Sequence, residues 1–371
     1  MRRVLHLIDS WGAGGAETVF ADLASGLDPA RFTSLAAVPR STGWLHEELV
    51  RRGIAPAILP SGGAFDLRHL WRLVGLIRRE RADVLQAHTL GTGVYAGAAG
   101  LVCRVPVVAT FHGFVDLART DARRAVKLRA LRAGVDRVVC VSAALRQALL
   151  EESPLDPGQV AVIFNGVDTN RFRPGRNAAL RRELGVADDE FLVGAVGNVR
   201  PAKGYEVLLD AAVLLRQAGV RCRLVIAGIA RGPLFAEMEA RHAALGLGDL
   251  VRFVGFRDDV DEFYRALDLY LLTSHSEGFS LSTVQALATG LPAVATRCGG
   301  PEEIMTDGVD GVLVPAGSPA AIAEAVAALA GDAARRASLG AAARVTAESR
   351  FSTRAMLAQY EALYEDLAPA G

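Results

Sequence analysis

Cysteine is scarce in this sequence: 371 residues contain only four. Cys103, Cys140, Cys222 and Cys298 lie too far apart for a zinc ribbon, a C-x-x-C redox pair or a disulfide framework. Long apolar runs are absent as well. The run after the N-terminal arginines has only about five residues, too short for a signal peptide, and no segment reaches the roughly 18 apolar residues of a spanning helix. We therefore expect a cytoplasmic protein that is neither secreted nor membrane-spanning.

Net charge is also absent, because 41 Lys and Arg balance 41 Asp and Glu. The charges are uneven along the chain: residues 1–176 hold 23 basic and 16 acidic residues, and the rest hold 18 and 25. Residues 119–132 interleave basic side chains with Leu117, Val126, Leu128 and Leu131. This segment is either a solvated helix or an amphipathic helix in peripheral contact with anionic lipid at the inner face of the membrane. No nucleic-acid motif accompanies it, so we expect no nucleic-acid partner.

The composition, with 51% hydrophobic and 22% charged residues, is typical of a folded globular chain whose length predicts about two domains. Short apolar runs of strand length alternate with segments of helical spacing, which favours parallel strands buried on both faces. The first series occupies residues 3–8, 32–38, 54–59, 83–87, 106–110, 137–142 and 160–164. After Pro174 the pattern restarts at residues 191–197, 221–227, 251–254, 268–272, 292–296 and 311–314.

These two series predict an α/β protein with two doubly wound, Rossmann-like domains, over residues 1–175 and 190–350. Residues 352–367 carry apolar side chains at helical spacing, so we expect a last helix that packs by this stripe. In open parallel sheets, ligands bind beyond the carboxyl ends of the strands. We expect the functional residues there, in a cleft between the domains.

A glycine turn follows the first predicted strand, at residues 12–17 (G-A-G-G-A-E). Around Gly14 and Gly15, backbone N–H groups at the start of a helix could approach a phosphate. Glu17 stands where a dinucleotide fingerprint has its third glycine. A phosphate or sugar loop and a plain tight turn therefore both remain open.

Two histidines come directly after predicted strands of the first half. His88 follows D-V-L-Q-A, and His112 follows P-V-V-A-T-F. A neutral imidazole at a strand end can bond a sugar hydroxyl or act as a base. The alternative is a polar residue satisfied in the core, and position favours a functional role more for His112.

The second half carries two further groups of candidates. Arg200 and Lys203 end its first strand at a glycine turn, where both cations could reach one pyrophosphate or pair with a carboxylate. Glu277 begins the block E-G-F-S-L, in which the amides of Gly278, Phe279, Ser280 and Leu281 precede a helix that carries Gln285. An acidic acceptor beside free amides can hold sugar hydroxyls and a phosphate together, although an ordinary helix cap is the alternative.

Taken together, these motifs resemble the family-4 retaining glycosyltransferases, which have the GT-B fold and use nucleotide-sugar donors. The resemblance covers nearly the whole chain. It rests on the order of short motifs: G-G-A-E, T-F-H-G ending at Gly113, Val141-Ser142, Asn165 to Asp168, Arg171 to Pro174, R-P-A-K-G, Val254 to Asp259, E-G-F-S-L, Thr289 to Ala295 and Asp307 to Pro315.

The resemblance implies a role for each candidate. Gly14 and Gly15 would lie near the donor phosphates and sugar, and His112 would contact the sugar near the reacting centre. Arg200 and Lys203 would clamp the pyrophosphate, without a metal or another cofactor. The remaining donor contacts would be Glu277 for sugar hydroxyls, the adjoining Gly278, the amides of Phe279, Ser280 and Leu281 for phosphate, and Gly255, Phe256 and Arg257 around the base. The last helix would cross back onto the first domain.

Two positions depart from the family pattern. Gln285 stands where a second glutamate usually holds the ribose, a change expected to weaken binding by about 1 kcal/mol. Asn198 replaces an arginine found in many members, which leaves Arg200 as the nearest substitute. We interpret both as variation within an active enzyme.

The resemblance therefore implies a metal-independent glycosyltransferase that moves a sugar from a nucleotide diphosphate donor to an acceptor, with retention. The basic segment at 119–132 suggests that the acceptor is a glycan that is lipid-linked or belongs to the cell envelope. Two alternatives remain. One is a sugar-nucleotide epimerase of the same fold. The other is a catalytically impaired sugar-nucleotide-binding protein, motivated by Gln285 and Asn198.

Overall fold

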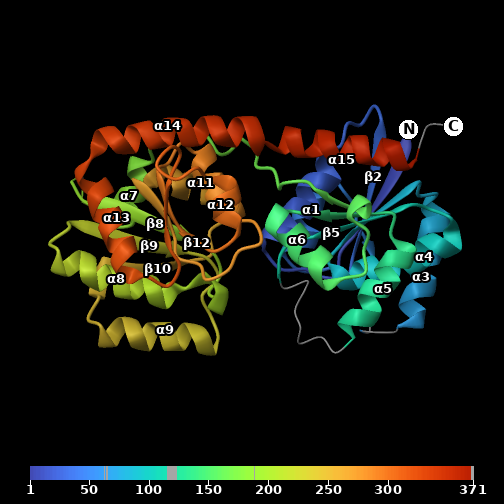
Figure 1. Cartoon of the computed structure of the whole chain (residues 1–371), viewed down its shortest axis with the longest axis horizontal. Coiled ribbons are helices and arrows are strands. Elements are labelled where there is room, and N and C mark those ends of the chain that lie inside the picture. Colours follow the sequence, from blue (N-terminus) through green and yellow to red (C-terminus); the bar gives the residue numbers. More distant parts are fainter. Residues whose placement is uncertain (62, 64–65, 115–122, 188, 369–371) are drawn as a thin grey trace. The chain divides into compact units, whose positions relative to one another are not determined.

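The computed structural model describes residues 1–61, 63, 66–114, 123–187 and 189–368 (Figure 1). It divides into two compact units. Unit 1 comprises Met1–Gly166 together with Thr353–Gly371, and unit 2 comprises Val167–Ser352. Each unit is built on a parallel sheet with helices between the strands, so the α/β prediction is confirmed.

The sheet of unit 1 has the strand order β3-β2-β1-β4-β5-β6-β7. Its strands are β1 (Arg2–Leu7), β2 (Phe32–Val38), β3 (Ala57–Ile58), β4 (Val84–His88), β5 (Val107–Phe111), β6 (Arg137–Cys140) and β7 (Val160–Val162). Every residue of β4 and β5 is buried, as expected for strands covered on both faces. β1 pairs with β2 on one side and β4 on the other, so the chain reverses its winding direction there. The carboxyl end of such a pair is where doubly wound sheets bind ligands.

Helices connect the strands of unit 1. They are α1 (Gly15–Gly26), α2 (Trp44–Arg51), α3 (Leu67–Glu80), α4 (Leu90–Cys103), α5 (Arg124–Gly134) and α6 (Ala143–Glu152). The short 3-10 helix η2 (Pro157–Gln159) precedes β7. α4 packs between α3 and α5, and the backbone of Gly97 on α4 lies so close to Gly134 on α5 that a Cβ at Gly97 would be 3.1 Å from it.

The last helix, α15 (Thr353–Leu367), belongs to unit 1 although the chain has passed through unit 2 before it. Its buried stripe is Met356, Tyr360 and Tyr364. Tyr360 Oη shares a hydrogen bond of 3.0 Å with Thr110 Oγ1, and Tyr364 Oη donates to Gln86 Oε1 at 2.9 Å. The stripe predicted from helical spacing is therefore used to cover the sheet.

Unit 2 has the strand order β10-β9-β8-β11-β12-β13. Its strands are β8 (Phe191–Val196), β9 (Cys222–Ala227), β10 (Val251–Gly255), β11 (Leu269–Leu272), β12 (Ala293–Arg297) and β13 (Val312–Pro315). Its helices are α7 (Ala178–Glu183), α8 (Tyr205–Gln217), α9 (Pro233–Ala244), α10 (Val260–Ala266), α11 (Leu281–Ala288), α12 (Gly300–Ile304), α13 (Pro319–Gly331) and α14 (Ala333–Arg350), with 3-10 turns η3 (Pro201–Lys203) and η4 (Gly248–Leu250). Buried aliphatic residues of β8, β9 and α8 form its main core.

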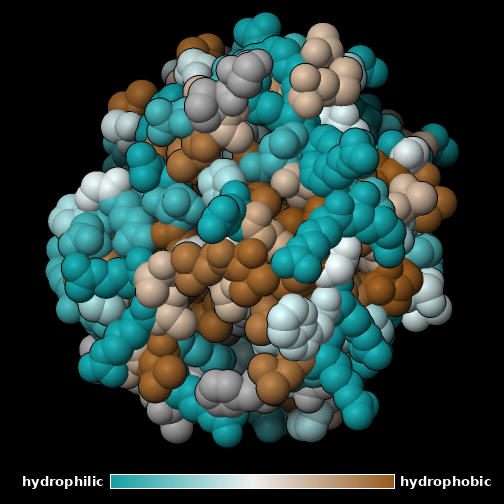
Figure 2. Space-filling view, turned by 90° about the vertical axis from the view of Figure 1, so that its right-hand side faces the viewer, coloured by the Kyte–Doolittle hydropathy of each residue, from teal (hydrophilic) through white to brown (hydrophobic). Residues whose placement is uncertain are grey.

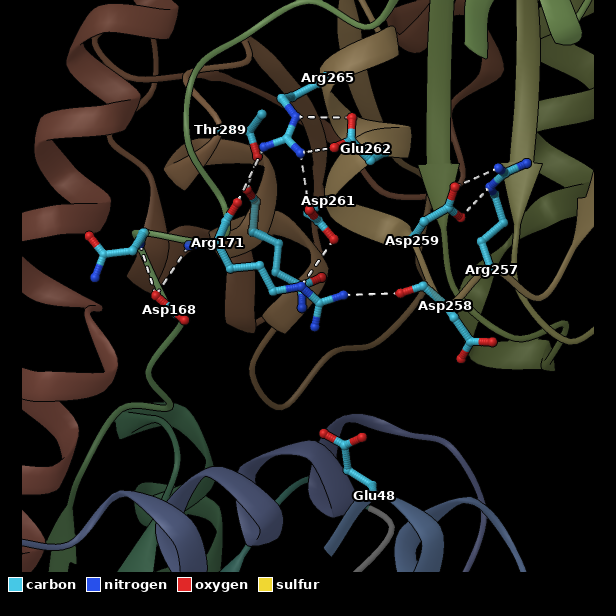
Figure 3. Close-up of polar contacts among 12 residues, drawn as sticks. Glu48, Asp168, Arg171, Arg257, Asp258, Asp259, Asp261, Glu262, Arg265 and Thr289 are labelled. Carbon is cyan, nitrogen blue, oxygen red and sulfur yellow. Dashed lines mark hydrogen bonds and ion pairs between the residues drawn. The ribbon is translucent and has the colours of Figure 1, made fainter. Parts of the chain in front are cut away.

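The boundary between the units falls earlier than the sequence predicted. Unit 1 ends at Gly166 rather than at residue 175, because the following segment is bonded to unit 2. Arg344 on α14 donates to the carbonyl oxygens of Phe172 at 2.7 Å and Thr169 at 3.0 Å. Arg171 donates to Asp261 at 3.0 Å, and Arg265 bonds the same carboxylate (Figure 3).

Unit 2 likewise extends beyond the predicted range of residues 190–350 at both ends. Before β8, α7 packs on α10, and the buried Arg181 donates to Asp268 Oδ2 at 2.8 Å. After α14, the carbonyl oxygen of Phe351 accepts from the amide of Val167 at 2.8 Å. The two chain segments that link the units are therefore paired at Val167 and Ser352.

Candidate active site

The glycine turn of unit 1 opens a helix, as predicted. Gly14 is the N-cap residue of α1, and no side-chain cap accepts from the first amides. Gly15 faces open space, whereas a Cβ at Gly14 would lie 2.5 Å from Oε2 of Glu17. The carboxylate of Glu17 suits the positive end of the helix. The first amides of α1 can therefore donate to an anion or a hydroxyl.

Three histidines meet beside this turn, at the carboxyl ends of β1, β4 and β5. Nδ1 of His88 and Nε2 of His112 lie 2.8 Å apart, and the two rings are nearly parallel, at 11°. The ring of Phe20 on α1 packs edge-on against His88, with centroids 5.1 Å apart, and against His6 at 6.1 Å. The structure thus joins the two sequence candidates His88 and His112 and adds His6, which the sequence analysis missed.

Burial keeps these histidines neutral. It lowers the pKa of His6 to about 3 and that of His112 to about 4. The pKa of His88 lies well below its ordinary value, through burial first and then the neighbouring His112 and His6. One ring of the His88–His112 pair therefore donates its N–H and the other accepts. A neutral imidazole of this kind can exchange hydrogen bonds with a sugar hydroxyl at neutral pH.

The main charged pair of the candidate site lies in unit 2. Nζ of Lys203, at the end of η3, lies 2.7 Å from Oε1 of Glu277, which follows β11. The hydroxyl of Ser274 donates to the same carboxylate oxygen at 2.7 Å. The Lys203 and Glu277 side chains are 20% and 13% exposed, so both are shielded yet reachable.

The surroundings of this pair favour its charged form. Burial alone would lower the pKa of Lys203, but Glu277 and other nearby groups outweigh it, and the pKa is raised. The backbone of Glu277 is fixed by bonds with Cys298 O at 3.1 Å and Gly300 N at 2.9 Å. Gly204 has φ 61°, and a Cβ there would overlap the carbonyl oxygen of Thr273. Glycine therefore lets the Lys203 turn approach the strand end that carries Glu277.

The block after Glu277 forms the start of α11, as predicted. Ser280 is its N-cap residue, and its Oγ accepts from the amide of Thr283 at 3.3 Å. Gly300 packs on the preceding residues so closely that a Cβ there would lie 3.0 Å from Phe279 Cα. Phe279 itself is buried, with its ring 5.7 Å from that of Phe351. The segment from Gly278 to the start of α11 at Leu281 is therefore fixed by the contacts of Phe279 with Gly300 and with Phe351.

Gln285 lies on α11, one turn after Leu281. Its Oε1 accepts a hydrogen bond of 3.3 Å from the hydroxyl of Tyr264, which also donates to Ser282 O at 2.8 Å. This partner was not apparent from the sequence, because Tyr264 belongs to a different helix. Because the Tyr264 hydroxyl is the donor, a glutamate carboxylate at position 285 could accept the same hydrogen bond.

Asn198 connects two loops of unit 2. Its side-chain oxygen accepts from the amide of Ile229 at 2.9 Å, and the amide of Val199 donates to Ile229 O at 2.9 Å. These bonds tie the loop after β8 to the loop after β9. Arg200, two residues later, is exposed and has no carboxylate partner among the described residues. Its guanidinium is therefore available to an anion.

The residues expected around the base lie at the end of β10. Gly255 has φ 76°, and Phe256 is 46% exposed. Arg257 donates twice to Asp259, at 2.8 Å for each oxygen (Figure 3). Hydrogen bonding to Asp259 raises the pKa of Arg257, and the guanidinium holds the pKa of Asp259 below its usual range. The guanidinium is thus held in place, with backbone and Phe256 left to face a ligand.

The segment predicted to contact lipid differs from expectation. Residues 119–122 and Leu117 lie outside the described residues, and the rest forms α5. Leu128 and Leu131 are buried in unit 1, and only Val126 of the described apolar residues in this segment is a large exposed one. Leu128 and Leu131 are therefore not available to lipid, and Leu131 packs against Gly93 of α4 instead.

Among the described residues, no three His, Cys, Asp or Glu side chains are grouped so that they could hold a metal ion. Of the helices in the described part of the chain, none is both long and apolar enough to span a bilayer.

Solved structures with the same architecture define the class of protein. The Anabaena Alr3699/HepE protein, crystallised with UDP and glucose, superimposes with a TM-score of 0.89 and 26% identity, over 99% of this chain and all of that one. The two parallel-sheet units are those of a GT-B glycosyltransferase.

Sequence comparisons give the family. Residues 13–171 match the model of Glycosyltransferase Family 4, and residues 177–346 match that of Glycosyl transferases group 1. D-inositol 3-phosphate glycosyltransferase of Geodermatophilus obscurus is 34% identical over 78% of this chain and 68% of that protein. The mannosyltransferase LpsB of Rhizobium meliloti, of lipopolysaccharide core biosynthesis, is 34% identical over 54% of this chain and 60% of its own. This chain belongs to the family-4, group 1 glycosyltransferases.

Proposed function

We propose that this protein transfers a sugar from a nucleotide diphosphate donor to an acceptor with retention of anomeric configuration. The Lys203–Glu277 pair carries the proposal. It places a shielded cation and a carboxylate 2.7 Å apart, beside the start of α11. A cation can bind the diphosphate while a carboxylate accepts from sugar hydroxyls, so this pair suits a ligand that contains both.

The donor is held as follows in this proposal. Arg200 and Lys203 bind the pyrophosphate, and Glu277 moves its acceptor oxygens from Lys203 to the sugar. The amides of Phe279, Ser280 and Leu281 bind phosphate, Gln285 the ribose, and Gly255 to Arg257 the base. The HepE protein, also solved with UDP-glucose, supports a uridine donor.

In this proposal, the positive groups of the site also help the diphosphate to leave. Arg200, Lys203 and the helix amides stabilise charge that develops on the departing group, and this is the largest catalytic contribution available to such a site. We therefore propose that transfer needs no metal and no cofactor. In unit 1, His112, Gly14 and Gly15 keep the roles near the donor sugar and phosphates that the resemblance implies.

The acceptor is proposed to be a glycan that is lipid-linked or belongs to the cell envelope, with the protein in the cytoplasm. The name of the R. meliloti relative, a lipopolysaccharide core mannosyltransferase, supports a cell-envelope acceptor. The contact of residues 119–132 with anionic membrane stays part of the proposal, and Arg123, Arg129 and Arg132 are the exposed cations among its described residues.

A donor screen tests this function. The protein is melted with UDP, GDP, ADP and their common sugar conjugates, with magnesium and with EDTA, and sugar release is followed by chromatography. We expect one base to raise the melting temperature equally in EDTA, and its sugar conjugate to be consumed only with an acceptor glycan.

Other outcomes of the screen identify the alternatives. A new sugar nucleotide formed without acceptor would indicate an epimerase, and binding without consumption by any acceptor would indicate a protein that has lost turnover. The product's anomeric configuration, read by NMR, decides retention. A melting shift that disappears in EDTA would overturn the metal-free mechanism.

A further inference from the structure

Two buried tyrosines of unit 2 hold Ser282, the second residue of α11. The hydroxyl of Tyr270, on β11, donates to Ser282 Oγ at 2.8 Å. The hydroxyl of Tyr264, on α10, donates to the carbonyl oxygen of Ser282 at 2.8 Å. Both tyrosines are fully buried, and their ring centroids lie 5.9 Å apart. Ser282 is therefore fixed through its side chain and through its backbone.

Tyr270 lies beside the charged pair of the candidate site. Burial raises the pKa of Tyr270, and the neighbouring Lys203 ammonium offsets only part of this effect. The phenol therefore keeps its proton at neutral pH and donates it to Ser282. The same Lys203 ammonium contacts Glu277 at 2.7 Å. The Tyr270–Ser282 hydrogen bond thus adjoins the two residues that carry the proposed function.

The hydroxyl protons around the start of α11 outnumber their acceptors. Tyr270 uses its proton on Ser282 Oγ. Thr283 Oγ1 donates to Ser280 Oγ at 2.7 Å. The hydroxyls of Ser280 and Ser282 lie 3.4 Å apart, a long distance at which only one of them can donate to the other. Since each serine hydroxyl has one proton, one of these two protons has no acceptor among the described residues.

The proton without an acceptor is assigned to Ser282, because Ser280 does not reach the surface. Ser280 is 1% exposed, and its Oγ accepts from the amide of Thr283 at 3.3 Å. Ser282 is partly exposed. The first amides of a helix have no intrahelical acceptor, and no bond of the Ser282 amide occurs among the described residues. One residue thus offers both a hydroxyl proton and an amide proton.

We infer that Ser282 binds the diphosphate of the donor through its hydroxyl as well as its amide, and that Tyr270 is the positioning residue that orients this hydroxyl. The Tyr270 proton occupies one lone pair of Ser282 Oγ, so the serine proton points elsewhere. An anionic oxygen is the acceptor with which it forms the strongest bond. The inference rests on the proposed function, because it extends the phosphate contacts of that site from Leu281 to Ser282.

Titration calorimetry with inorganic pyrophosphate, UDP and uridine tests the role of Ser282. Pyrophosphate makes the test independent of the base of the donor. Ser282→Ala should weaken the binding of pyrophosphate and UDP at least tenfold, because a hydrogen bond to a charged phosphate is lost, and should leave uridine binding unchanged. Ser282→Thr keeps the hydroxyl and should bind all three ligands within about twofold of the wild type.

A double-mutant cycle tests the role of Tyr270. Tyr270→Phe leaves the Ser282 hydroxyl without its orienting bond and should weaken pyrophosphate binding about threefold. In the Ser282→Ala background the same change should have no further effect on binding, because Tyr270 acts only through Ser282. Equal losses in both backgrounds would show that Tyr270 does not position Ser282. The double variant replaces both hydroxyls by apolar groups, so its melting temperature should be close to that of the wild type.

Matched control variants lie away from the site. Tyr360→Phe removes a buried tyrosine hydroxyl that shares a hydrogen bond of 3.0 Å with Thr110 Oγ1 in unit 1. Ser349→Ala removes a serine hydroxyl of α14 that donates to the carbonyl oxygen of Val345 at 2.8 Å. Both variants should bind the three ligands as the wild type does.

Uridine is the control for a base that stacks on exposed apolar side chains. Figure 2 shows such side chains gathered in the middle of one face of unit 1, and Trp71 of this unit is 63% exposed. A base that stacks there binds independently of residue 282. If Ser282→Ala loses uridine and pyrophosphate binding to the same extent, the effect is not specific to phosphate and the inference is wrong.

The wild type separates a failure of this inference from a failure of the proposed function. If the wild type binds pyrophosphate or UDP and Ser282→Ala binds them equally well, the inference is wrong and the donor site stands. If the wild type binds neither of them, nor any nucleotide of the donor screen, the proposed donor site is wrong and the inference falls with it.

Discussion

His88 and His112 are joined by a hydrogen bond of 2.8 Å between Nδ1 of the first ring and Nε2 of the second. The two residues end neighbouring strands, β4 and β5, which pair in register so that His88 lies opposite Thr110. The bond occupies one nitrogen of each ring and so fixes how the two rings are oriented.

The buried histidines predict that the protein loses stability in mild acid. The folded pKa of His112 is about 4, against 6.5 when exposed, so the unfolded chain binds more protons between these values. The free energy of unfolding is therefore highest above pH 6.5. It falls as the pH drops toward 4, by up to about 1.4 kcal/mol per pH unit for each such histidine. Urea denaturation at pH 7 and pH 5 measures the loss.

His6→Leu should reduce that acid loss. His6 is fully buried, and neither ring nitrogen has a hydrogen-bond partner among the described residues. Leucine keeps the apolar contact with Phe20 and cannot take up a proton. We expect the free energy of unfolding at pH 5 to rise relative to the wild type by more than at pH 7. Equal changes at both values would show that His6 does not titrate as the structure implies.

The Lys203–Glu277 pair predicts separate effects on stability and turnover. Lys203→Met leaves a shielded carboxylate unpaired, so we expect the free energy of unfolding to fall by about 1–3 kcal/mol and turnover to fall at least a hundredfold. Lys203→Met combined with Glu277→Gln should recover most of the stability but no turnover.

A surface ion pair of the same unit is the control for this prediction. Arg241 donates to Asp210 at 2.7 Å, and Arg241→Met should change stability by less than about 0.5 kcal/mol. Chemical denaturation and sugar release are measured on each variant. If Lys203→Met keeps wild-type turnover, Lys203 has no part in the mechanism.

Gln285→Glu should strengthen nucleotide binding about fivefold, because a charged acceptor forms the stronger hydrogen bond with ribose hydroxyls. The Tyr264 hydroxyl already donates to this position, so the variant should fold normally. Titration calorimetry with the nucleotide found in the donor screen gives the affinity, with Gln285→Leu as the opposite change. If neither variant alters the affinity, residue 285 does not contact the ribose.

Gly204→Ala should cost much more stability than Gly219→Ala. Both glycines have positive φ, 61° and 70°, so alanine is strained by about 1 kcal/mol at either position. Only at Gly204 would the new methyl group overlap a backbone oxygen, that of Thr273, whereas Gly219 faces open space. We expect an additional loss of about 2 kcal/mol and a displaced Lys203 turn. Equal costs in urea denaturation would contradict the close approach.

The fold was largely predictable because its signals are local. Apolar runs such as residues 106–110 and 191–197 became buried strands, and the stripe of Met356 and Tyr360 became the buried face of α15. The glycine turn before α1 and the start of α11 were likewise predicted at the right places. Each of these signals depends on spacing within a few residues, which a sequence displays directly.

The end of unit 1 at Gly166 and the burial of Leu128 and Leu131 on α5 could not be read from the sequence, because both depend on contacts between distant segments. Arg344 holds Phe172 in unit 2 across 172 positions of the chain, and nothing local marks that bond. Leu131 looks like part of a surface helix until α4 is placed beside it, where it packs against Gly93.

By itself, the sequence determined the class of fold, the order of the elements and the family, since these follow from periodicity and from short motifs in a fixed order. Only the tertiary structure decided which side chains meet: Lys203 with Glu277, Gln285 with Tyr264, and His88 with His112. The physical reason is that strands distant in sequence end at one edge of a parallel sheet. The partners of a side chain at that edge are set by strand order and register, which no local pattern encodes.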